Sequence, residues 1–177
     1  MKIVHVGNHT FPCRGGIEEV IWKSAQYQSL QGNEVKIIVF NSCNKGNKLP
    51  EYEKIEKVEI TRLPSRNLGF YKLPSKKKLL PLLKDADIIH IHGFGGWLDT
   101  IALNRSKLKG KIILTTHGGF FHTPQRTLLK QFYLKIWLPY ISGKVDHVIY
   151  VSHSDFEKLH AYMKRDYSII PNGVDTR

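Results

Sequence analysis

The stretch that decides the fold reads HVGNHTFPCRGGIE and spans residues 5–18. It follows an apolar run at residues 2–6 and precedes a helical pattern of apolar residues over residues 16–31. This order predicts a strand, a loop and a helix, with Gly15 and Gly16 at the start of the helix.

A helix N-terminus presents unpaired backbone N–H groups and a partial positive charge. Without a Cβ at Gly15 and Gly16, an anion such as phosphate can approach these groups closely. The alternative is a tight turn that connects the strand to the helix and binds no ligand. The stretch matches neither the dinucleotide pattern GxGxxG nor a P-loop, which disfavours a hydride carrier and an ATPase.

The composition indicates one globular domain. The chain has 177 residues, 41% of them hydrophobic, and no run of transmembrane length. The apolar run at residues 2–6 is too short for a secretory signal, so a cytoplasmic protein is expected. The net charge of +12 favours anionic partners: nucleic acid, phosphorylated substrates or an anionic membrane surface.

Two cysteines, Cys13 and Cys43, are too few for a disulfide framework. Both follow predicted strands at one edge of the sheet, so a pairing is geometrically open. The expectation is nevertheless two free thiols in a reducing compartment.

Apolar runs predict strands at residues 2–6, 34–40, 57–63, 87–92, 111–116, 145–151 and 167–170. Helical patterns occupy residues 16–31, 75–84, 97–107, 124–141 and 152–163, whereas the Pro- and Gly-punctuated residues 64–74 are expected to be loop. This alternation predicts an α/β fold, a parallel sheet with helices on both faces.

Ligands of such sheets bind outside the carboxyl ends of the strands. Four polar, glycine-marked loops are expected to converge there, and they contain Gly15-Gly16, His92-Gly93, Thr116-His117-Gly118-Gly119 and Val151-Ser152.

Several motifs occur together in an order typical of one known family. They are Gly15-Gly16-Ile17-Glu18, Gln31-Gly32-Asn33-Glu34-Val35, Asp87-Ile88-Ile89-His90-Ile91-His92-Gly93, Thr115-Thr116-His117-Gly118, Val151-Ser152 and Ile170-Pro171-Asn172-Gly173-Val174-Asp175. The chain resembles the N-terminal half of a GT-B glycosyltransferase of the group 1, or GT4-like, family.

The resemblance implies two Rossmann-like domains facing a cleft, and retaining transfer of a sugar from a nucleotide-sugar donor. It implies that residues 1–170 form the acceptor-side domain and that residues 171–177 begin the interdomain linker. The C-terminal, donor-binding domain would be absent here, so the isolated half is expected to be inactive.

The partners implied are a nucleotide-sugar donor, a sugar or lipid-linked acceptor and the C-terminal domain of the same chain. No metal, no separate cofactor and no nucleic acid are expected. Many proteins of this family act at membranes, so a peripheral contact with the inner membrane face is a further expectation.

By resemblance, His117 contacts the transferred sugar and is the candidate catalytic residue. The alternative is a loop histidine that bonds only to backbone. Gly15, Gly16, His92 and Gly118 are the candidate substrate- or phosphate-binding residues. The family has no agreed protein nucleophile, so none is assigned.

His90 and His92 lie two residues apart on a strand and therefore share one face. With His117 and His122, a zinc site is conceivable. No cysteine or carboxylate cluster joins them, so a structural role for His90 and a rim position for His92 are preferred.

The other polar and charged residues are expected to have structural or surface roles. Glu18 and Glu19 are expected to complement the helix dipole, and Asp99 and Ser152 are only weak candidates at the rim. The lysines at 76–78 and Lys84 predict a solvated face, with an amphipathic contact to anionic lipid as the alternative.

The helix predicted at residues 124–141 carries more apolar residues than one core-facing stripe needs. A stripe of Leu129, Phe132, Ile136 and Tyr140 is expected to pack on the sheet. The remaining apolar residues, interspersed with Arg126, Lys130 and Lys135, suit a membrane interface or an amphiphilic acceptor. The alternatives are a fully buried helix and a subunit contact.

Two other functions remain open at this point. The positive charge suits a basic α/β nucleic-acid-binding module, although no helix-turn-helix, zinc or RNP-like pattern supports one. Half of a GT-B-like sugar-nucleotide epimerase would share the same architecture.

Overall fold

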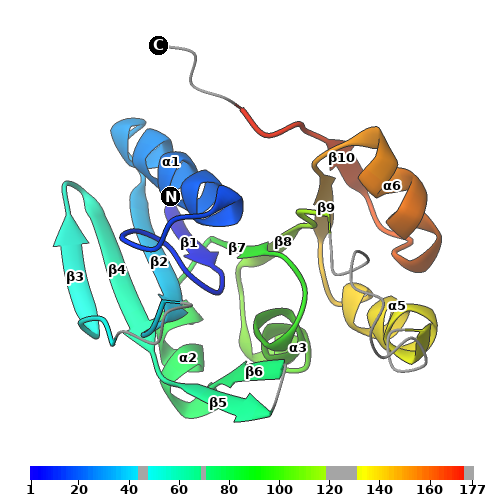
Figure 1. Ribbon diagram of the computed structural model, residues 1–177, viewed down its shortest axis with the longest axis horizontal. Coiled ribbons are helices and arrows are strands. Elements are labelled where there is room, and N and C mark those ends of the chain that lie inside the picture. The colour runs from blue at the N-terminus through cyan, green and yellow to red at the C-terminus, as the bar shows by residue number, and fades with distance from the viewer. Residues whose placement is uncertain (44–47, 69–70, 119–130, 174–177) are drawn as a thin grey trace.

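The structure, a computed structural model, describes residues 1–43, 48–68, 71–118 and 131–173. Its centre is an eight-stranded sheet in the order β10-β9-β8-β7-β1-β2-β4-β3 (Figure 1). All neighbouring strands pair in parallel except β3, which is antiparallel to β4. The strands are β1 (Lys2–Val6), β2 (Glu34–Phe40), β3 (Tyr52–Ile55), β4 (Val58–Leu63), β7 (Ile88–His92), β8 (Lys111–Thr115), β9 (His147–Tyr150) and β10 (Tyr167–Ile169).

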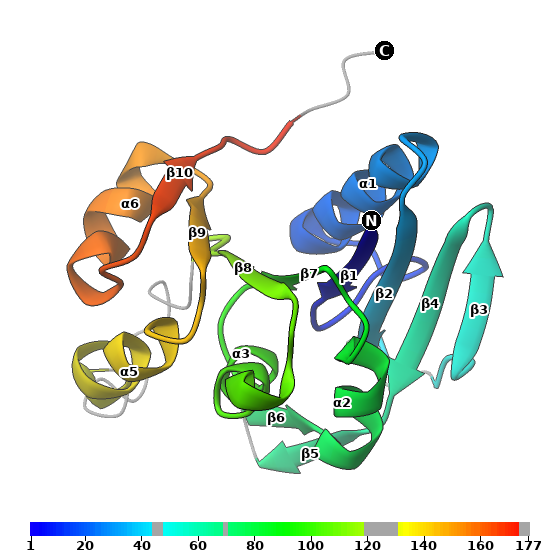
Figure 2. The ribbon, with the colours of Figure 1, turned by 180° about the vertical axis from the view of Figure 1, so that it is seen from behind.

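Helices lie on both faces of this sheet, which confirms the predicted fold class (Figures 1 and 2). The α-helices among the described residues include α1 (Gly16–Leu30), α2 (Lys76–Leu83), α3 (Gly96–Ala102), α5 (Leu138–Ser142) and α6 (His153–Leu159). Short segments are the 3₁₀ turns η1 (Arg105–Lys107) and η3 (His160–Tyr162) and the π-helical η2 (Tyr133–Trp137).

The alternation of strand side chains divides the core in two. On one face, Ile21 and Ala25 of α1 pack on Val35 and Ile37 of β2. The opposite face carries the larger cluster, to which α2, α3, α5 and α6 all contribute. The central strands are therefore largely buried on both sides, as their mostly apolar sequences predict.

The prediction of a loop at residues 64–74 is wrong. Strands β5 (Ser65–Leu68) and β6 (Tyr71–Pro74) form a separate antiparallel pair. Strand β3 was also missed, because its sequence YEKI carries two charges and lies at a sheet edge. The helices predicted at 97–107 and 152–163 are each shorter and end in a 3₁₀ turn.

The lysines of α2 form a solvated face, because residues 76–78 are exposed while Leu79 and Leu83 are buried in the core. Leu79 and Leu83 thus serve the core, whereas Leu82 is 37% exposed. The alternative of a contact between α2 and anionic lipid stays a prediction.

The stripe expected to pack on the sheet is also wrong. Phe132, Ile136 and Tyr140 are 52%, 60% and 54% exposed, whereas Leu138 and Ile141 are buried. Leu129, Arg126 and Lys130 lie outside the described residues. Among the described helices, none combines the length and the apolar character that crossing a bilayer requires.

Cys13 and Cys43 form a disulfide, with their Cα atoms 5.6 Å apart, so the expectation of free thiols is wrong. They follow the carboxyl ends of the adjacent strands β1 and β2, and this shared edge brings them together. These two cysteines therefore do not indicate a reducing compartment.

Arg62, near the end of β4, holds the loop after β1 by hydrogen bonding. Its side chain is fully buried and donates to the Phe11 carbonyl at 2.9 Å, the Pro50 carbonyl at 3.3 Å and Glu53 Oε2 at 2.7 Å. These bonds from its two terminal nitrogens compensate the burial of the guanidinium, although Nε finds no partner among the described residues.

We predict that Arg62→Met lowers the free energy of unfolding by about 3 kcal/mol, because two backbone carbonyls and a carboxylate lose their donor. Urea denaturation measures this change. Glu53→Gln is the matched control and should cost much less, since Glu53 is 37% exposed and an amide oxygen still accepts from Arg62. Equal losses in the two variants would contradict this role of Arg62.

Candidate functional site

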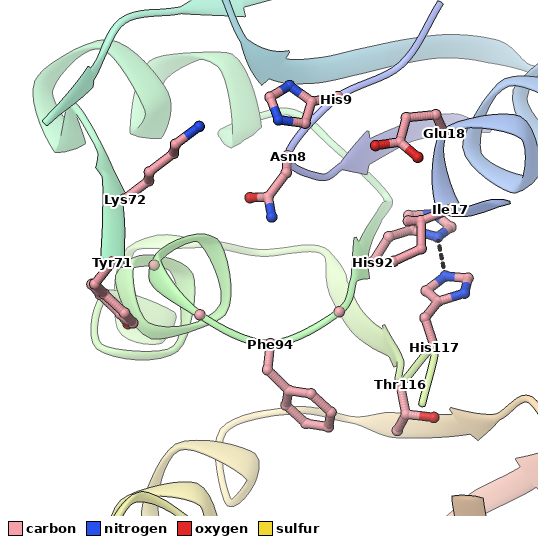
Figure 3. A pocket seen from close by; sticks show the side chains of 13 residues that line it. Asn8, His9, Ile17, Glu18, Tyr71, Lys72, His92, Phe94, Thr116 and His117 are labelled. Carbon is pink, nitrogen blue, oxygen red and sulfur yellow. Dashed lines mark hydrogen bonds between the residues drawn. The ribbon is translucent and has the colours of Figure 1, made fainter. Parts of the chain in front are cut away.

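A pocket of about 400 Å³ opens at the carboxyl ends of the central strands (Figure 3). This volume is in the range of small-ligand sites. Its walls come from the loop after β1, the start of α1, strand β6 and the loops after β7 and β8. The lining residues are Asn8, His9, Ile17, Glu18, Tyr71, Lys72, His92, Gly93, Phe94, Gly95, Gly96, Thr116 and His117.

The two loops after β7 and β8 use left-handed backbone. Gly93, Gly95 and Gly118 have φ values of 85°, 109° and 79°, and His117 has φ 50°. Such values are uncommon for a residue with a Cβ and are held only by their surroundings. Gly118 follows His117 in the chain but does not line the pocket.

Gly15 and Gly16 lie at the N-terminus of α1, beside the pocket rather than in its lining. A Cβ on Gly16 would meet no atom within 4 Å, whereas one on Gly15 would collide with the Glu18 carboxylate. Glu18 therefore folds back over the first turn, as a carboxylate stabilised by the helix dipole does, and it also lines the pocket. Glu19 is exposed and does not line it.

The histidines form a hydrogen-bonded chain that ends in the pocket. His117 Nε2 lies 3.0 Å from His92 Nδ1, and His92 Nε2 lies 2.9 Å from His5 Nδ1. His5 Nε2 lies 2.7 Å from Gln28 Oε1 on α1. Figure 3 shows the contact between His92 and His117 at the pocket wall.

Burial keeps these rings neutral. Desolvation lowers the pKa of His5 to about 4, although its bond with Gln28 opposes the shift. Desolvation also lowers the pKa of His117 to about 4, with Asp155 acting in the opposite direction. The pKa of His92 is lowered well below its usual value by burial and then by His90, His5 and His117.

Three of these rings, His5, His90 and His92, have nitrogens within 4.8 Å of one another. His90 does not line the pocket; its Nε2 bonds to Thr115 Oγ1 at 2.7 Å. No carboxylate belongs to this group of described residues. His122, part of the conceivable zinc site, lies outside the described residues, and the absence of a metal stays a prediction.

The other two candidates at the rim, Ser152 and Asp99, make structural hydrogen bonds. Ser152 caps α6 by accepting the Asp155 N–H at 3.1 Å, and Thr116 Oγ1 donates to the Asp155 carboxylate. Asp99 is buried at the start of α3 and accepts hydrogen bonds from the hydroxyls of Tyr71 and Tyr133. These contacts attach the pocket loops to their neighbours.

Sequence reasoning missed the contribution of β6, because residues 64–74 were expected to be loop. Tyr71 and Lys72 line the pocket, and the Lys72 carbonyl packs so closely on Gly96 that a Cβ there would clash. Tyr71 and Leu73 flank Lys72, and this alternation of apolar and polar residues was the available signal.

Comparisons with known proteins identify the family of the chain. The model of Glycosyltransferase Family 4 matches residues 14–177. A Xanthomonas campestris protein named GDP-mannose:cellobiosyl-diphosphopolyprenol alpha-mannosyltransferase is 32% identical over 99% of this chain and 47% of its own length. A Komagataeibacter xylinus protein of the same name is 24% identical over 99% of this chain and 44% of its own length. The chain thus spans about half the length of these relatives.

Solved structures show the same fold. Sucrose-phosphate synthase from Thermosynechococcus elongatus superposes with a TM-score of 0.65 at 16% identity, over 98% of this chain and 48% of that one. A structure described as trehalose-6-phosphate from E. coli bound with UDP-2-fluoro glucose gives a TM-score of 0.67 at 16% identity, over 99% and 49%. The fold is that of the N-terminal domain of a GT-B glycosyltransferase. The chain belongs to Glycosyltransferase Family 4.

We predict that the fold loses stability as the pH falls from 7 to 5. His5 is fully buried, and its pKa of about 4 lies below the ordinary 6.5, so the unfolded chain takes up the proton first. The contribution is complete above pH 6.5 and decreases as the pH falls toward 4, by about 2 kcal/mol at pH 5 from His5 alone. Urea denaturation at both pH values measures it.

His5→Asn, which lacks the titrating ring, should show a smaller difference between pH 7 and pH 5. The same slope in this variant and in the native chain would mean that other groups carry the pH dependence.

Proposed function

We propose that this chain is the acceptor-side domain of a retaining glycosyltransferase that takes a sugar from a nucleotide-sugar donor. The observation that carries the proposal is the pocket at the strand ends, with His117 in its wall, in a chain of Glycosyltransferase Family 4. The family favours glycosyl transfer over the nucleic-acid-binding and epimerase alternatives.

The names of the relatives suggest specific substrates. Those relatives are named for GDP-mannose as donor and for a sugar on diphosphopolyprenol as acceptor. We infer the same substrate classes here: GDP-mannose, and a sugar linked through diphosphate to a lipid. The basic character of the chain and the presence of Lys72 in the pocket suit the phosphates of both substrates.

Each pocket group has a proposed part in this transfer. His117 contacts the transferred sugar, and His92 holds the His117 ring through their hydrogen bond. The N–H groups at Gly15 and Gly16 bind a phosphate, which requires the Glu18 carboxylate to move from the first turn of α1. Gly118 provides the left-handed turn after His117.

Residues 1–170 are proposed as this domain, residues 171–177 as the start of a linker, and a C-terminal domain as the main donor site. No metal is needed, because N–H groups and cationic side chains meet the phosphate charge. The 177-residue chain alone is therefore expected to bind acceptor without transferring sugar.

A membrane contact is the second part of the proposal. Phe132, Ile136 and Tyr140 are spaced by four residues and all exposed, and together we name them the exposed stripe. Lys135 is exposed beside it, and Lys144 Nζ lies 5.6 Å from the centre of the Tyr140 ring. Aromatic and basic groups together suit the interface of an anionic bilayer, where a lipid-linked acceptor resides.

We predict that, in the protein at its natural length, His117→Ala reduces mannose transfer by roughly 100-fold or more, since a group in contact with the reacting sugar is lost. Gly16→Val should abolish transfer and keep the melting temperature, because its side chain enters open space at the phosphate site. Transfer of radiolabelled mannose from GDP-mannose to a diphosphopolyprenol-linked cellobiose is the measurement.

His153→Ala is the matched control, since His153 is exposed and outside the pocket. Full turnover by His117→Ala would exclude the assigned role, and substantial transfer by the 177-residue chain alone would exclude the two-domain proposal.

We predict that the chain binds phosphatidylglycerol vesicles and that added salt weakens this binding. Replacing the exposed stripe by serine should weaken it by about tenfold or more, because three side chains no longer enter the bilayer. Vesicle flotation measures it. Tyr27→Ser with Leu30→Ser removes comparably exposed apolar groups from α1 and is the control. A native chain that ignores these vesicles at low salt would contradict the membrane proposal.

A further inference from the structure

The histidine chain has a second end, on the surface of the domain away from the pocket. Gln28 lies in the last turns of α1, half-buried, and its Oε1 is 2.7 Å from His5 Nε2. Its backbone carbonyl accepts from Asn33 N at 3.3 Å and from Asn33 Nδ2 at 3.0 Å. These bonds fix the backbone that carries the Gln28 amide.

All contacts of the chain have the same orientation. In each of the three rings, Nε2 bonds to the neighbour on the Gln28 side, and in His5 and His92 Nδ1 bonds to the next ring toward the pocket. The contacts are Gln28 Oε1 to His5 Nε2, His5 Nδ1 to His92 Nε2, and His92 Nδ1 to His117 Nε2. A neutral imidazole has one donor and one acceptor. The direction of one bond therefore determines the direction of every other.

We propose that Gln28 is a positioning residue that sets the tautomer of His117 through His5 and His92. The Gln28 oxygen accepts, so His5 carries its hydrogen on Nε2 and accepts at Nδ1. His92 and His117 must then do the same, and His117 presents Nδ1 as an acceptor.

The tautomer of His117 matters for sugar transfer only if the proposed function holds, so this consequence rests on the proposed function. An acceptor at His117 Nδ1 suits a sugar hydroxyl, which donates its hydrogen. In the reversed chain the same nitrogen would carry a hydrogen and offer only a donor. Gln28 thus acts on the sugar contact from a different element, without touching the pocket.

A metal on His5, His90 and His92 is the competing interpretation of the same cluster. Zinc at about 2.0–2.1 Å from each nitrogen needs a free lone pair on every ligand. The facing nitrogens of His5 and His92 are 2.9 Å apart and share a hydrogen, and His90 Nε2 bonds to Thr115. These bonds favour the hydrogen-bonded chain.

The first test reads the tautomers directly. In the ¹⁵N-histidine-labelled chain, long-range ¹H–¹⁵N NMR distinguishes protonated from unprotonated ring nitrogens. We expect hydrogen on Nε2 of His5, His92 and His117 in the native chain and in Gln28→Glu, whose carboxylate only accepts. Gln28→Leu removes the acceptor, so His117 should shift to the Nδ1–H form in part or in full.

Gln26→Leu is the matched control, since Gln26 lies on the same helix and, among the described residues, its side chain bonds to exposed Glu56 alone. It should leave all three tautomers unchanged. An unchanged His117 in Gln28→Leu would overturn the proposal. Addition of zinc to the native chain is a further arm: stoichiometric binding that removes the Nε2 hydrogens of His5 or His92 would also overturn it.

The second test uses the protein at its natural length. Gln28→Leu should lower kcat about tenfold with little change in KM, as loss of an outer hydrogen-bond partner does at other sites, and Gln28→Glu should restore it. A shifted tautomer with unchanged kcat would overturn the positioning role. If no variant and no native protein transfers mannose while the tautomers shift as expected, the proposed function fails and the tautomer assignment stands.

Discussion

The parallel pairing of β1 with β7 is the constraint on which the site depends. It sets His5 opposite His90, and the pairing of β7 with β8 sets His92 opposite Thr115. Backbone hydrogen bonds thereby fix the spacing of rings that lie 87 residues apart in sequence. A shift of one residue in this register would turn the histidines to the other face of the sheet.

The sequence predicted the sheet well because each central strand is a mostly apolar run bounded by glycine or a polar residue. Residues 34–40 were predicted with the bounds that β2 has. The β5–β6 pair and β3 were missed, since charges and prolines there dilute the pattern. The exposed stripe was assigned to the core because periodicity identifies an apolar face without saying what covers it.

The site was predictable only in part. Strand ends identified the rim, and His92 and His117 do line the pocket. Lys72 and Tyr71 come from the β5–β6 pair, which no motif marked. The link from His5 to Gln28 joins a strand to a helix end, so it depends on packing that a local pattern does not encode. Sequence spacing likewise left the pairing of Cys13 with Cys43 open, because strand order decides which loops become neighbours.

The two edges of the sheet differ from its centre in a way that affects how the protein associates. At one edge, β3 carries Glu53 and Lys54 and runs antiparallel to its neighbour; at the other, β10 has only three residues. Short or charged edges are poor templates for adding a strand from another chain. Self-association through continuous β-sheet, the route to amyloid-like aggregates, is therefore disfavoured at both edges.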